Sequence, residues 1–497
     1  MKERKTPVTT EHVERETKYD AASSFVLPDL SGVVPDGGRV ERSVLRLDSV
    51  YFDTESRDLL TRGITLRSRS GSTDTGWQLK VPTGDARTEI RLDPTGTQTT
   101  VPEELATLVA GVRRGNALRH IVTVRTDRTV HRVLTVDGQL VVEVADDTVD
   151  AVAPGRRTAT LTTWREIEAE LGAAGDDATL TAVGTLLTAA GATPSTSANK
   201  VAKALGVTAP NQDSGRKPQT AGEVIRGYLS EQDQALITGD LSLRRGLGAI
   251  HPTRVATRRL RSTLRIFAAY VDPDRAQAFD AELSWYAALL GQVRDREVQR
   301  ARFTAAISEL PEEQVLGPVA ARIEQHLLAE QIQHQQTLDK AMNGRRYLAL
   351  LAESARWVTD PPFTDLADSK PSALRAQVKA AARKVKKHLT AGLGPGGDDE
   401  DLHKARKAGK RARYAAELAG PVLGKKTKNA VKHYQELQDI LGDLQDGVVA
   451  ADLLRRIAAG TPEEPNENGF TYGLLYAHEM HRSQESRRQA QSWADTL

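Results

Sequence analysis

Charged side chains of both signs alternate along several short segments in the first part of the chain. The sets with this spacing are Glu14, Glu16 and Lys18; Arg67 and Arg69; and Glu166, Glu168 and Glu170. Because successive side chains of a β-strand point to opposite faces, each set would share one face. Carboxylates bind hard cations such as magnesium, whereas arginine and lysine bind phosphate oxygens. Together inside a barrel, these groups could promote metal-assisted phosphoryl transfer, although a solvated polar face is the alternative for any single strand.

The elements that carry these side chains are predicted to be short strands. Alternation of polar and apolar residues recurs at 77–80, 139–144 and 164–171. Turn sequences such as Asp36-Gly37-Gly38 and Asp137-Gly138 separate the segments. Many short strands with few helices indicate an antiparallel barrel or sandwich.

The second half of the chain contains basic residues at helical spacing. His251, Arg254, Arg258, Arg261 and Arg265 follow one another at intervals of 3, 4, 3 and 4 residues, which places them on one helix face. Like charges at this spacing repel, so a stripe without acids favours an external polyanion as its partner. A solvated charged face is the alternative.

The same pattern occurs a second time. The second copy contains His403, Arg406, Lys410 and Arg413, with Glu417 at the position of Arg265. Further on, Leu290-Gly291-x-Val293-x-Asp295 matches Leu441-Gly442-x-Leu444-x-Asp446. Residues 375–388 form a third basic segment. These matches predict a helical bundle built from two related units around a pseudo-two-fold axis.

Length and composition limit the class of protein. A chain of 497 residues is too long for one core, and polar residues 207–217 predict a linker between domains 1–206 and 218–497. The net charge is only +2, and the absence of cysteine excludes disulfides and thiolate zinc sites. No apolar run is long enough to span a membrane, and Met1–Thr10 lacks the apolar core of a signal peptide. We therefore expect a cytoplasmic protein.

The first 206 residues resemble the CYTH superfamily, the triphosphate tunnel metalloenzymes. The resemblance rests on the order of several motifs, which are Glu14-x-Glu16-x-Lys18, Tyr51-Phe52-Asp53-Thr54, Gly63-Ile64-x-Leu66-Arg67-x-Arg69, Trp77-x-Leu79-Lys80, Arg87-x-Glu89, Val142 to Asp147, Glu166 to Leu171, and Asn199-Lys200. It implies an eight-stranded antiparallel β tunnel that uses magnesium or manganese. The residues that resemble metal ligands are Glu14, Glu16, Asp147, Glu166 and Glu168. The residues that resemble the phosphate-binding cations of the catalytic site are Lys18, Arg67, Arg69, Lys80, Arg87, Arg125 and Lys200.

Residues 218–497 resemble the CHAD domain, a conserved-histidine α-helical domain. The pattern His-x-x-Arg-x-x-x-Arg-Arg-x-Arg and its repetition carry this resemblance. It implies that inorganic polyphosphate binds in a basic groove or pore, and that association with polyphosphate granules follows. The expected polyphosphate-binding residues are His251, Arg254, Arg258, Arg261, Arg265, Arg383, Lys387, His403, Arg406, Lys410 and Arg413.

Several functions are compatible with these features. The leading hypothesis is metal-dependent hydrolysis of inorganic triphosphate or a related small triphosphate in the tunnel, with polyphosphate binding by the helical domain. Hydrolysis of thiamine triphosphate and cyclisation of ATP need a base-recognition element, which the sequence does not identify. A non-catalytic polyphosphate-binding protein is a further alternative. Few aromatic residues accompany the basic stripes, so stacking on nucleic-acid bases has little support, and we do not expect a nucleic-acid partner.

Overall fold

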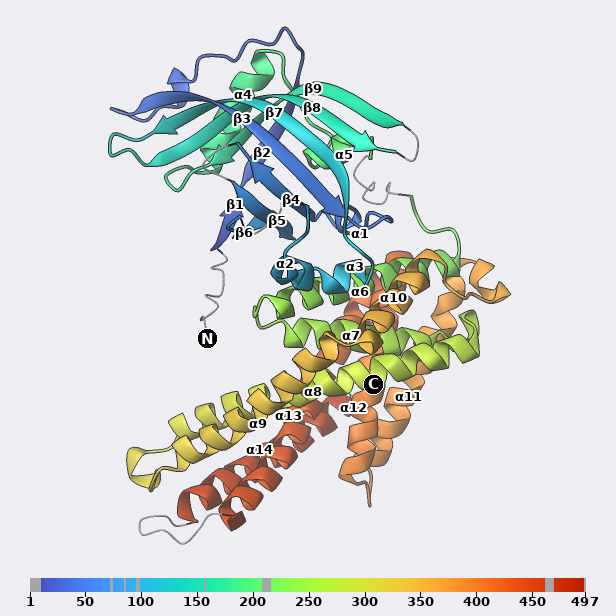
Figure 1. Ribbon diagram of the computed structural model, residues 1–497. Coiled ribbons are helices and arrows are strands. Elements are labelled where there is room, and N and C mark those ends of the chain that lie inside the picture. Colours follow the sequence, from blue (N-terminus) through green and yellow to red (C-terminus); the bar gives the residue numbers. More distant parts are fainter. Residues whose placement is uncertain are drawn as a thin grey trace. The chain divides into compact units, whose positions relative to one another are not determined.

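The computed structural model describes residues 10–71, 75–84, 86–94, 99–155, 158–207, 216–460 and 469–495 (Figure 1). The chain divides into two compact units, Met1–Gly215 and Arg216–Leu497. The first unit contains the strands and the second consists of helices. Most of the predicted linker, residues 208–215, lies outside the described residues.

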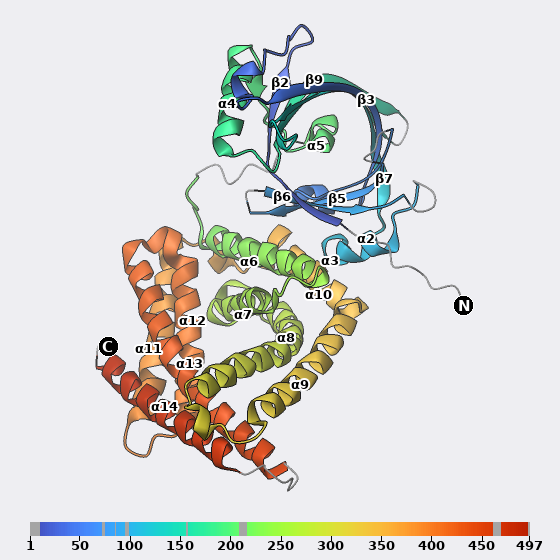
Figure 2. The same ribbon diagram turned by 90° about the vertical axis from the view of Figure 1, so that its left-hand side faces the viewer.

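The N-terminal unit is built on one antiparallel sheet of ten strands in the order β1-β6-β5-β4-β3-β7-β8-β9-β2-β10. The four longest strands, β3, β7, β8 and β9, have 13 to 16 residues each. The curled sheet surrounds an interior (Figure 2). The strands are β1 (Thr10–Glu14), β2 (Glu16–Ala21), β3 (Arg39–Asp53), β4 (Thr65–Ser70), β5 (Gly76–Thr83), β6 (Ala86–Leu92), β7 (Arg119–Leu134), β8 (Leu140–Pro154), β9 (Ala159–Leu171) and β10 (Thr193–Pro194).

The strand count differs from the predicted eight for a local reason. The first predicted strand is divided at Arg15 into β1, which pairs with β6, and β2, which pairs with β9. The two-residue β10 adds one more short pairing to β2. The hydrogen-bonded sheet is therefore not a closed ring, but the covalent chain at Arg15 joins β1 at one end to β2 near the other. The predicted antiparallel tunnel-like fold is confirmed with this small difference.

Two helices pack on opposite faces of the sheet. Helix α4 (Asp177–Ala189) covers the outside of β2, β8 and β9, where Val183 and Leu187 join a buried apolar cluster with Ile167. Helix α5 (Lys200–Ala204) lies within the ring of strands (Figure 2), where Val201 packs with buried valines of β7 and β8. The side chain of Asn199 caps α5 by accepting the N–H of Ala202 at 2.8 Å. Packing and cap together fix Lys200 at the start of this helix.

Three short helices complete the unit. They are α1 (Asp58–Thr61), α2 (Glu103–Leu108) and α3 (Ala110–Arg113). The buried Asp53 carboxylate accepts the N–H groups of Leu59 and Leu60 at 2.9 and 3.0 Å. The Tyr51-Phe52-Asp53-Thr54 motif therefore ends β3 and caps the turn of α1, which is a structural role for its aspartate.

The C-terminal unit is a bundle of long helices (Figure 1). The helices are α6 (Ala221–Arg244), α7 (Ile250–Ile266), α8 (Pro273–Ser308), α9 (Val319–Met342), α10 (Arg345–Thr359), α11 (Arg375–Leu393), α12 (Asp399–Leu423), α13 (Lys425–Gly460) and α14 (Phe470–Ala494). Neighbouring helices pack as α6–α7–α8–α9 and again as α11–α12–α13–α14. Helix α8 and helix α13 each have 36 residues, and α7 packs against α12. The predicted internal repeat therefore corresponds to two helical units in contact through their basic helices.

Glycines at equivalent positions of α8 and α13 lie beside equivalent arginines. A Cβ atom on Gly291 would lie 3.5 Å from Nε of Arg254, and one on Gly442 would lie 3.9 Å from Nη2 of Arg406, which is ordinary van der Waals contact. The same glycine and arginine neighbours therefore recur in both helical units. In the part of the chain that the structure describes, no helix combines the length and apolar character needed to cross a membrane.

Candidate functional site in the barrel and a basic cluster in the helices

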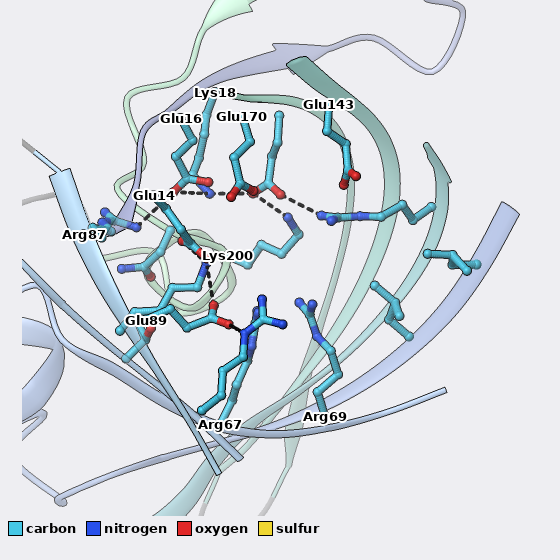
Figure 3. A pocket seen from close by; sticks show the side chains of 18 of the residues that line it. Glu14, Glu16, Lys18, Arg67, Arg69, Arg87, Glu89, Glu143, Glu170 and Lys200 are labelled. Atoms are coloured by element: carbon cyan, nitrogen blue, oxygen red, sulfur yellow. Dashed lines mark hydrogen bonds and ion pairs between the residues drawn. The ribbon is translucent and has the colours of Figure 1, made fainter. Parts of the chain in front are cut away.

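The barrel contains a cavity of about 320 Å³ with a mostly charged lining. Figure 3 shows Glu16, Glu143 and Glu170 on one side of it and Arg67 and Arg69 on the opposite side. The charged residues that line it are Glu14, Glu16, Lys18, Arg67, Arg69, Lys80, Arg87, Glu89, Arg91, Arg128, Arg132, Glu143, Glu168, Glu170 and Lys200. The strands thus bring the alternating residues of distant segments to one interior, where carboxylates and cations face each other.

Three carboxylates on β8 and β9 form a compact cluster. Asp147, Glu166 and Glu168 each provide an oxygen within 4.8 Å of the other two. The ammonium of Lys200 lies among them, at 2.9, 2.6 and 2.8 Å from their respective oxygens. Burial would lower the pKa of Lys200, but the three carboxylates outweigh burial and raise it. A cation at the centre of the cluster is therefore electrostatically favoured.

Glu168 is the member of the cluster that lines the cavity. It accepts hydrogen bonds from Lys18 at 2.5 Å and from Arg128 at 2.6 Å. Arg128 also binds both oxygens of Asp147, each at 2.7 Å. Burial raises the pKa of Glu168, but the neighbouring cations outweigh burial and hold this pKa well below its usual value. The carboxylate is therefore ionised at neutral pH.

Glu14 and Glu16 lie in the same cavity but outside this compact cluster. Glu14 pairs with Lys80 at 2.5 Å, and Glu16 pairs with Lys18 at 3.3 Å and with Arg87 at 3.4 Å. Burial is the main influence on Glu14 and raises its pKa. In Glu16 burial acts in the same direction, but the nearby cations outweigh it and lower the pKa. The five expected metal ligands therefore form two groups, one on β1 and β2 and the other on β8 and β9.

The arginines opposite these carboxylates have neutral hydrogen-bond partners, and Arg67 also lies near the carboxylate of Glu89. Arg67 donates from Nε to Gln78 at 2.6 Å and from Nη1 to the hydroxyl of Tyr51 at 3.0 Å. Arg69 donates to Ser49 at 3.4 Å. Burial raises the pKa of Tyr51, but Arg67 and Arg69 outweigh burial and lower it. Both arginines are buried, so their guanidinium groups are fixed before any ligand arrives.

Arg125 is not in the cavity, unlike the other expected phosphate-binding cations. Its side chain is 63% exposed and pairs with Asp48 at 3.0 Å on the outer face of β7. Arg128 and Arg132 line the cavity instead. Positions 125 and 128 differ by an odd number of residues, so alternation places them on opposite faces. Val122, Val124 and Val130 are buried at even positions of β7, but Ile121 and Val133 are buried at odd positions, so the apolar pattern of this strand did not reveal which side points inward.

Other lining residues were not among the predicted site residues. Glu89 follows Arg87 at alternate spacing on β6, so the pattern used for Arg67 and Arg69 could have identified it. Glu143 faces Glu170 across β8 and β9, and this pairing depends on a strand register that alternation does not reveal. Burial and the charge of Glu14 are the main causes that raise the pKa of Glu170 to about 7.

The helical unit brings basic residues of both repeats together. Arg254 and Arg258 on α7 lie close to Arg406 and Lys410 on α12. Burial, followed by the charges of the three arginines, lowers the pKa of Lys410 to about 6. Asp295 and Asp446 provide partial compensation at 3.6 Å from Arg254 and 3.7 Å from Arg406. We call Arg254, Arg258, Arg406 and Lys410 the central basic cluster.

The remaining residues of the predicted basic stripes have other surroundings. Arg261 and Arg265 both pair with Asp280 of α8, at 3.1 and 2.6 Å. Arg413 approaches Glu417 at 3.4 Å, and Nδ1 of His403 lies 2.9 Å from Oε1 of Gln445. The exposed residues of the expected set are His251, Arg265, Arg383 and Lys387. The stripes lack acids in the sequence, but neighbouring helices supply several of them in space.

Comparison with family models and curated proteins identifies both units. A CYTH domain matches residues 28–205, and a CHAD domain matches residues 227–455. The protein Rv2226 of Mycobacterium tuberculosis is 32% identical over 508 residues, which cover 98% of this chain and 96% of the relative. The chain belongs to the CYTH–CHAD family. This membership confirms the predicted domain types and their order, and Glu14, Glu16 and Lys18 precede the residues that match the CYTH model.

Two solved structures are similar to part of this chain. PptA from Streptomyces chartreusis has 22% identity and a TM-score of 0.47, over 56% of this chain and 100% of its own. The CHAD domain from the plant Ricinus communis has 23% identity and a TM-score of 0.46, over 56% of this chain and 93% of its own.

Proposed function

We propose that the CYTH domain hydrolyses inorganic triphosphate with a divalent metal ion. The observation that carries this proposal is the opposition, inside one cavity, of clustered carboxylates and buried arginines. Carboxylates alone would suit a metal site and arginines alone would suit an anion site. Both together suit a phosphate chain that is bound with a metal ion.

The residues that would hold the metal are Asp147, Glu166 and Glu168. Their oxygens are close together and are the hard ligands that magnesium and manganese prefer. Lys200 already demonstrates that a cation fits among them. Glu14 and Glu16 line the same cavity and are the further ligand candidates. A bound divalent ion would neutralise phosphate charge and help to activate water.

The side chains of the protein would bind and orient the phosphate chain. Arg67 and Arg69 are fixed on the wall opposite the carboxylates and would pair with phosphate oxygens. Lys80 and Arg87 would exchange their carboxylate partners for phosphate oxygens. Because these donors are fixed before substrate arrives, they would stabilise developing negative charge at little cost of reorganisation. The described lining offers no aromatic platform beyond Tyr51, which favours a substrate without a base.

Release of phosphate from a panel of substrates tests this proposal. The panel contains inorganic triphosphate, ATP, thiamine triphosphate and long polyphosphate, each with magnesium, with manganese and with excess chelator. We expect inorganic triphosphate to be hydrolysed fastest, and only with metal. Preference for thiamine triphosphate, or conversion of ATP to a cyclic product, would instead support the corresponding alternative. Full turnover in chelator would contradict the metal-dependent proposal.

We also propose that the CHAD domain binds inorganic polyphosphate at the central basic cluster. The low pKa of Lys410 supports this, since burial and then three neighbouring arginines lower it, and Asp446 compensates their charge only in part. A chain of phosphates would supply the missing charge, and its binding would weaken steeply with salt through counterion release. Filter binding of long polyphosphate to the full chain, with duplex DNA at equal phosphate concentration as control, tests this. Preference for DNA would replace polyphosphate with nucleic acid as the partner.

A further inference from the structure

A second cavity in the CHAD domain lies apart from the central basic cluster. It has a volume of about 200 Å³ and lies between α11, α12 and the end of α7. We call it the α11–α12 pocket. Its lining residues are Arg265, Ile266, Gln377, Ala380, Ala381, Lys384, His388, Lys404, Lys407, Ala408 and Arg411. No acidic residue of the described chain is among them, so the lining combines cationic, amide and small apolar groups.

The cations of the α11–α12 pocket are poorly compensated. Within the described residues, no acidic side chain forms an ion pair with Lys384, Lys407 or Arg411. Burial lowers the pKa of Arg411, and the charges of Arg265 and Arg261 add to this effect. Asp280 pairs with Arg265, and Glu400 and Asp401 pair with Lys404 at 3.1 and 3.2 Å, so two of the lining cations have acidic partners. The pocket therefore carries excess positive charge.

The internal repeat shows what is missing. Arg411 is equivalent to Arg259, and Arg265 is equivalent to Glu417, because the repeated stripes align without a gap. In the first copy, Arg259 pairs with Glu417 at 2.9 Å. In the second copy, the equivalent contact brings Arg411 close to Arg265. One side of the pseudo-symmetric bundle thus has a salt bridge where the other side has two arginines.

The hydroxyl of Tyr228 reinforces the salt bridge on the first side, where it donates to Glu417 at 3.1 Å. Such a site is complete without a ligand. The two arginines on the other side repel each other, and their repulsion would be relieved by an anion that enters from outside. The difference between the two sides therefore points to a ligand on the side of Arg265 and Arg411. A basic face that only contacts water would not need the cavity that lies beside these arginines.

We propose that the α11–α12 pocket binds a small organic phosphate monoester. Arg265, Arg411 and Lys384 would bind the phosphate group, since arginine pairs suit phosphate geometry. Ile266, Ala380 and Ala381 would contact a compact organic body, for which a free phosphate chain has no use. The volume is below the usual range for drug-sized ligands, about 300–1,000 Å³, so the body is small. This proposal does not depend on activity in the tunnel.

Calorimetry with the full chain tests the proposal with adenosine monophosphate, ribose 5-phosphate and adenosine. We expect the two phosphate esters to bind with saturation and adenosine not to bind. If both esters bind, the pocket recognises the phosphate and the sugar. If only adenosine monophosphate binds, the pocket also recognises the base. Lys384→Gln and Arg411→Gln should each weaken binding at least tenfold, the effect of one lost charge-assisted hydrogen bond.

Lys386→Gln is the matched control, because Lys386 is an exposed lysine of α11 that does not line the pocket. It removes the same charge and should leave the affinity for the esters unchanged. Lys384 is also exposed, so its variant tests the pocket even where Arg411→Gln disturbs the fold. Absence of saturable binding of either ester below about 10 mM would overturn the proposal. Equal losses with Lys384→Gln and Lys386→Gln, or tighter binding of tripolyphosphate to the pocket, would also overturn it.

Discussion

Lys200 of the CYTH domain and Lys410 of the CHAD domain are both largely withdrawn from solvent, but their surroundings are opposite. Lys200 contacts three carboxylates, which raise its pKa in spite of burial. Lys410 has three arginines as its main charged neighbours, and its pKa falls to about 6. Burial favours the neutral form of both lysines, so the neighbours decide the sign of the shift.

This difference separates two ways in which the two domains would bind phosphate. In the tunnel, Lys18, Lys80 and Lys200 have carboxylate partners, which they would exchange for phosphate oxygens when a metal ion takes the carboxylates. In the central basic cluster, Asp295 and Asp446 compensate only part of the positive charge, and a polyanion would supply the rest. On the proposed functions, mixed charge would suit chemistry on a short phosphate chain, and charge of one sign would suit binding of a long one.

The largest expected effect comes from Glu168→Gln. This change keeps the shape of a side chain that Lys18, Lys200 and Arg128 contact, but it removes the charge that holds the cluster together. We expect triphosphate hydrolysis to fall by about 100-fold to 1,000-fold, since both metal binding and alignment of cations are lost. Phosphate release at saturating magnesium measures this effect. Polyphosphate binding by the same variant should stay at the wild-type level, and loss of both functions would contradict the separation of the two regions.

A pair of arginine variants gives an intermediate effect. Arg67→Ala removes a fixed donor in the tunnel and should reduce hydrolysis about tenfold to 100-fold, while polyphosphate binding is unchanged. Arg258→Ala should do the reverse, because this residue lies in the central basic cluster. Kinetics and filter binding on both variants form a complete cross-test. Similar losses of hydrolysis in the two variants would show that the domains act as one site.

The smallest expected effect concerns pH and Lys410. Because its pKa is about 6 in the free protein, Lys410 is mostly neutral near pH 8 and must take up a proton to pair with phosphate. Polyphosphate affinity should therefore decrease several-fold from about pH 5.5 to about pH 8 at fixed ionic strength. Burial and then nearby cations lower the pKa values of His251 and His403, and these residues also gain charge on acidification, so Lys410→Arg is the appropriate comparison. Arginine stays charged throughout, and this variant should have a flatter pH profile. An unchanged profile would assign the pH dependence to the histidines.

Alternation along strands was sufficient to predict much of the tunnel. It places Glu14, Glu16 and Lys18 in one cavity with Arg67 and Arg69, as the structure does. It could not show that Arg128 rather than Arg125 lines the cavity. Alternation does not tell whether the odd or the even positions of a strand face inward until its buried face is known. It also could not predict that Glu143 faces Glu170, since register across two strands depends on the turns and on packing.

The helical domain shows a similar limit. The repetition at His403 of the pattern that begins at His251 predicted two related units, and the structure places their helices in contact. On α11, however, Lys384 and His388 line the α11–α12 pocket, whereas the predicted Arg383 and Lys387 do not. A shift of one residue turns a helical side chain by about 100°. The position of a neighbouring helix therefore decides which lysines line the same pocket. The spacing of basic residues along the sequence does not reveal that position.

The position of Lys200 has a consequence for how metal enters the tunnel. The lysine is attached to the barrel by α5, whose apolar residues pack between the strands. Its ammonium is therefore a tethered competitor for Asp147, Glu166 and Glu168, with the high effective concentration of any intramolecular ligand. On the proposed function, a metal ion would have to displace it, and a triphosphate would offer the displaced ammonium a new partner. Metal and substrate would therefore assist each other's binding, and a tunnel without substrate would resist loading by stray divalent ions.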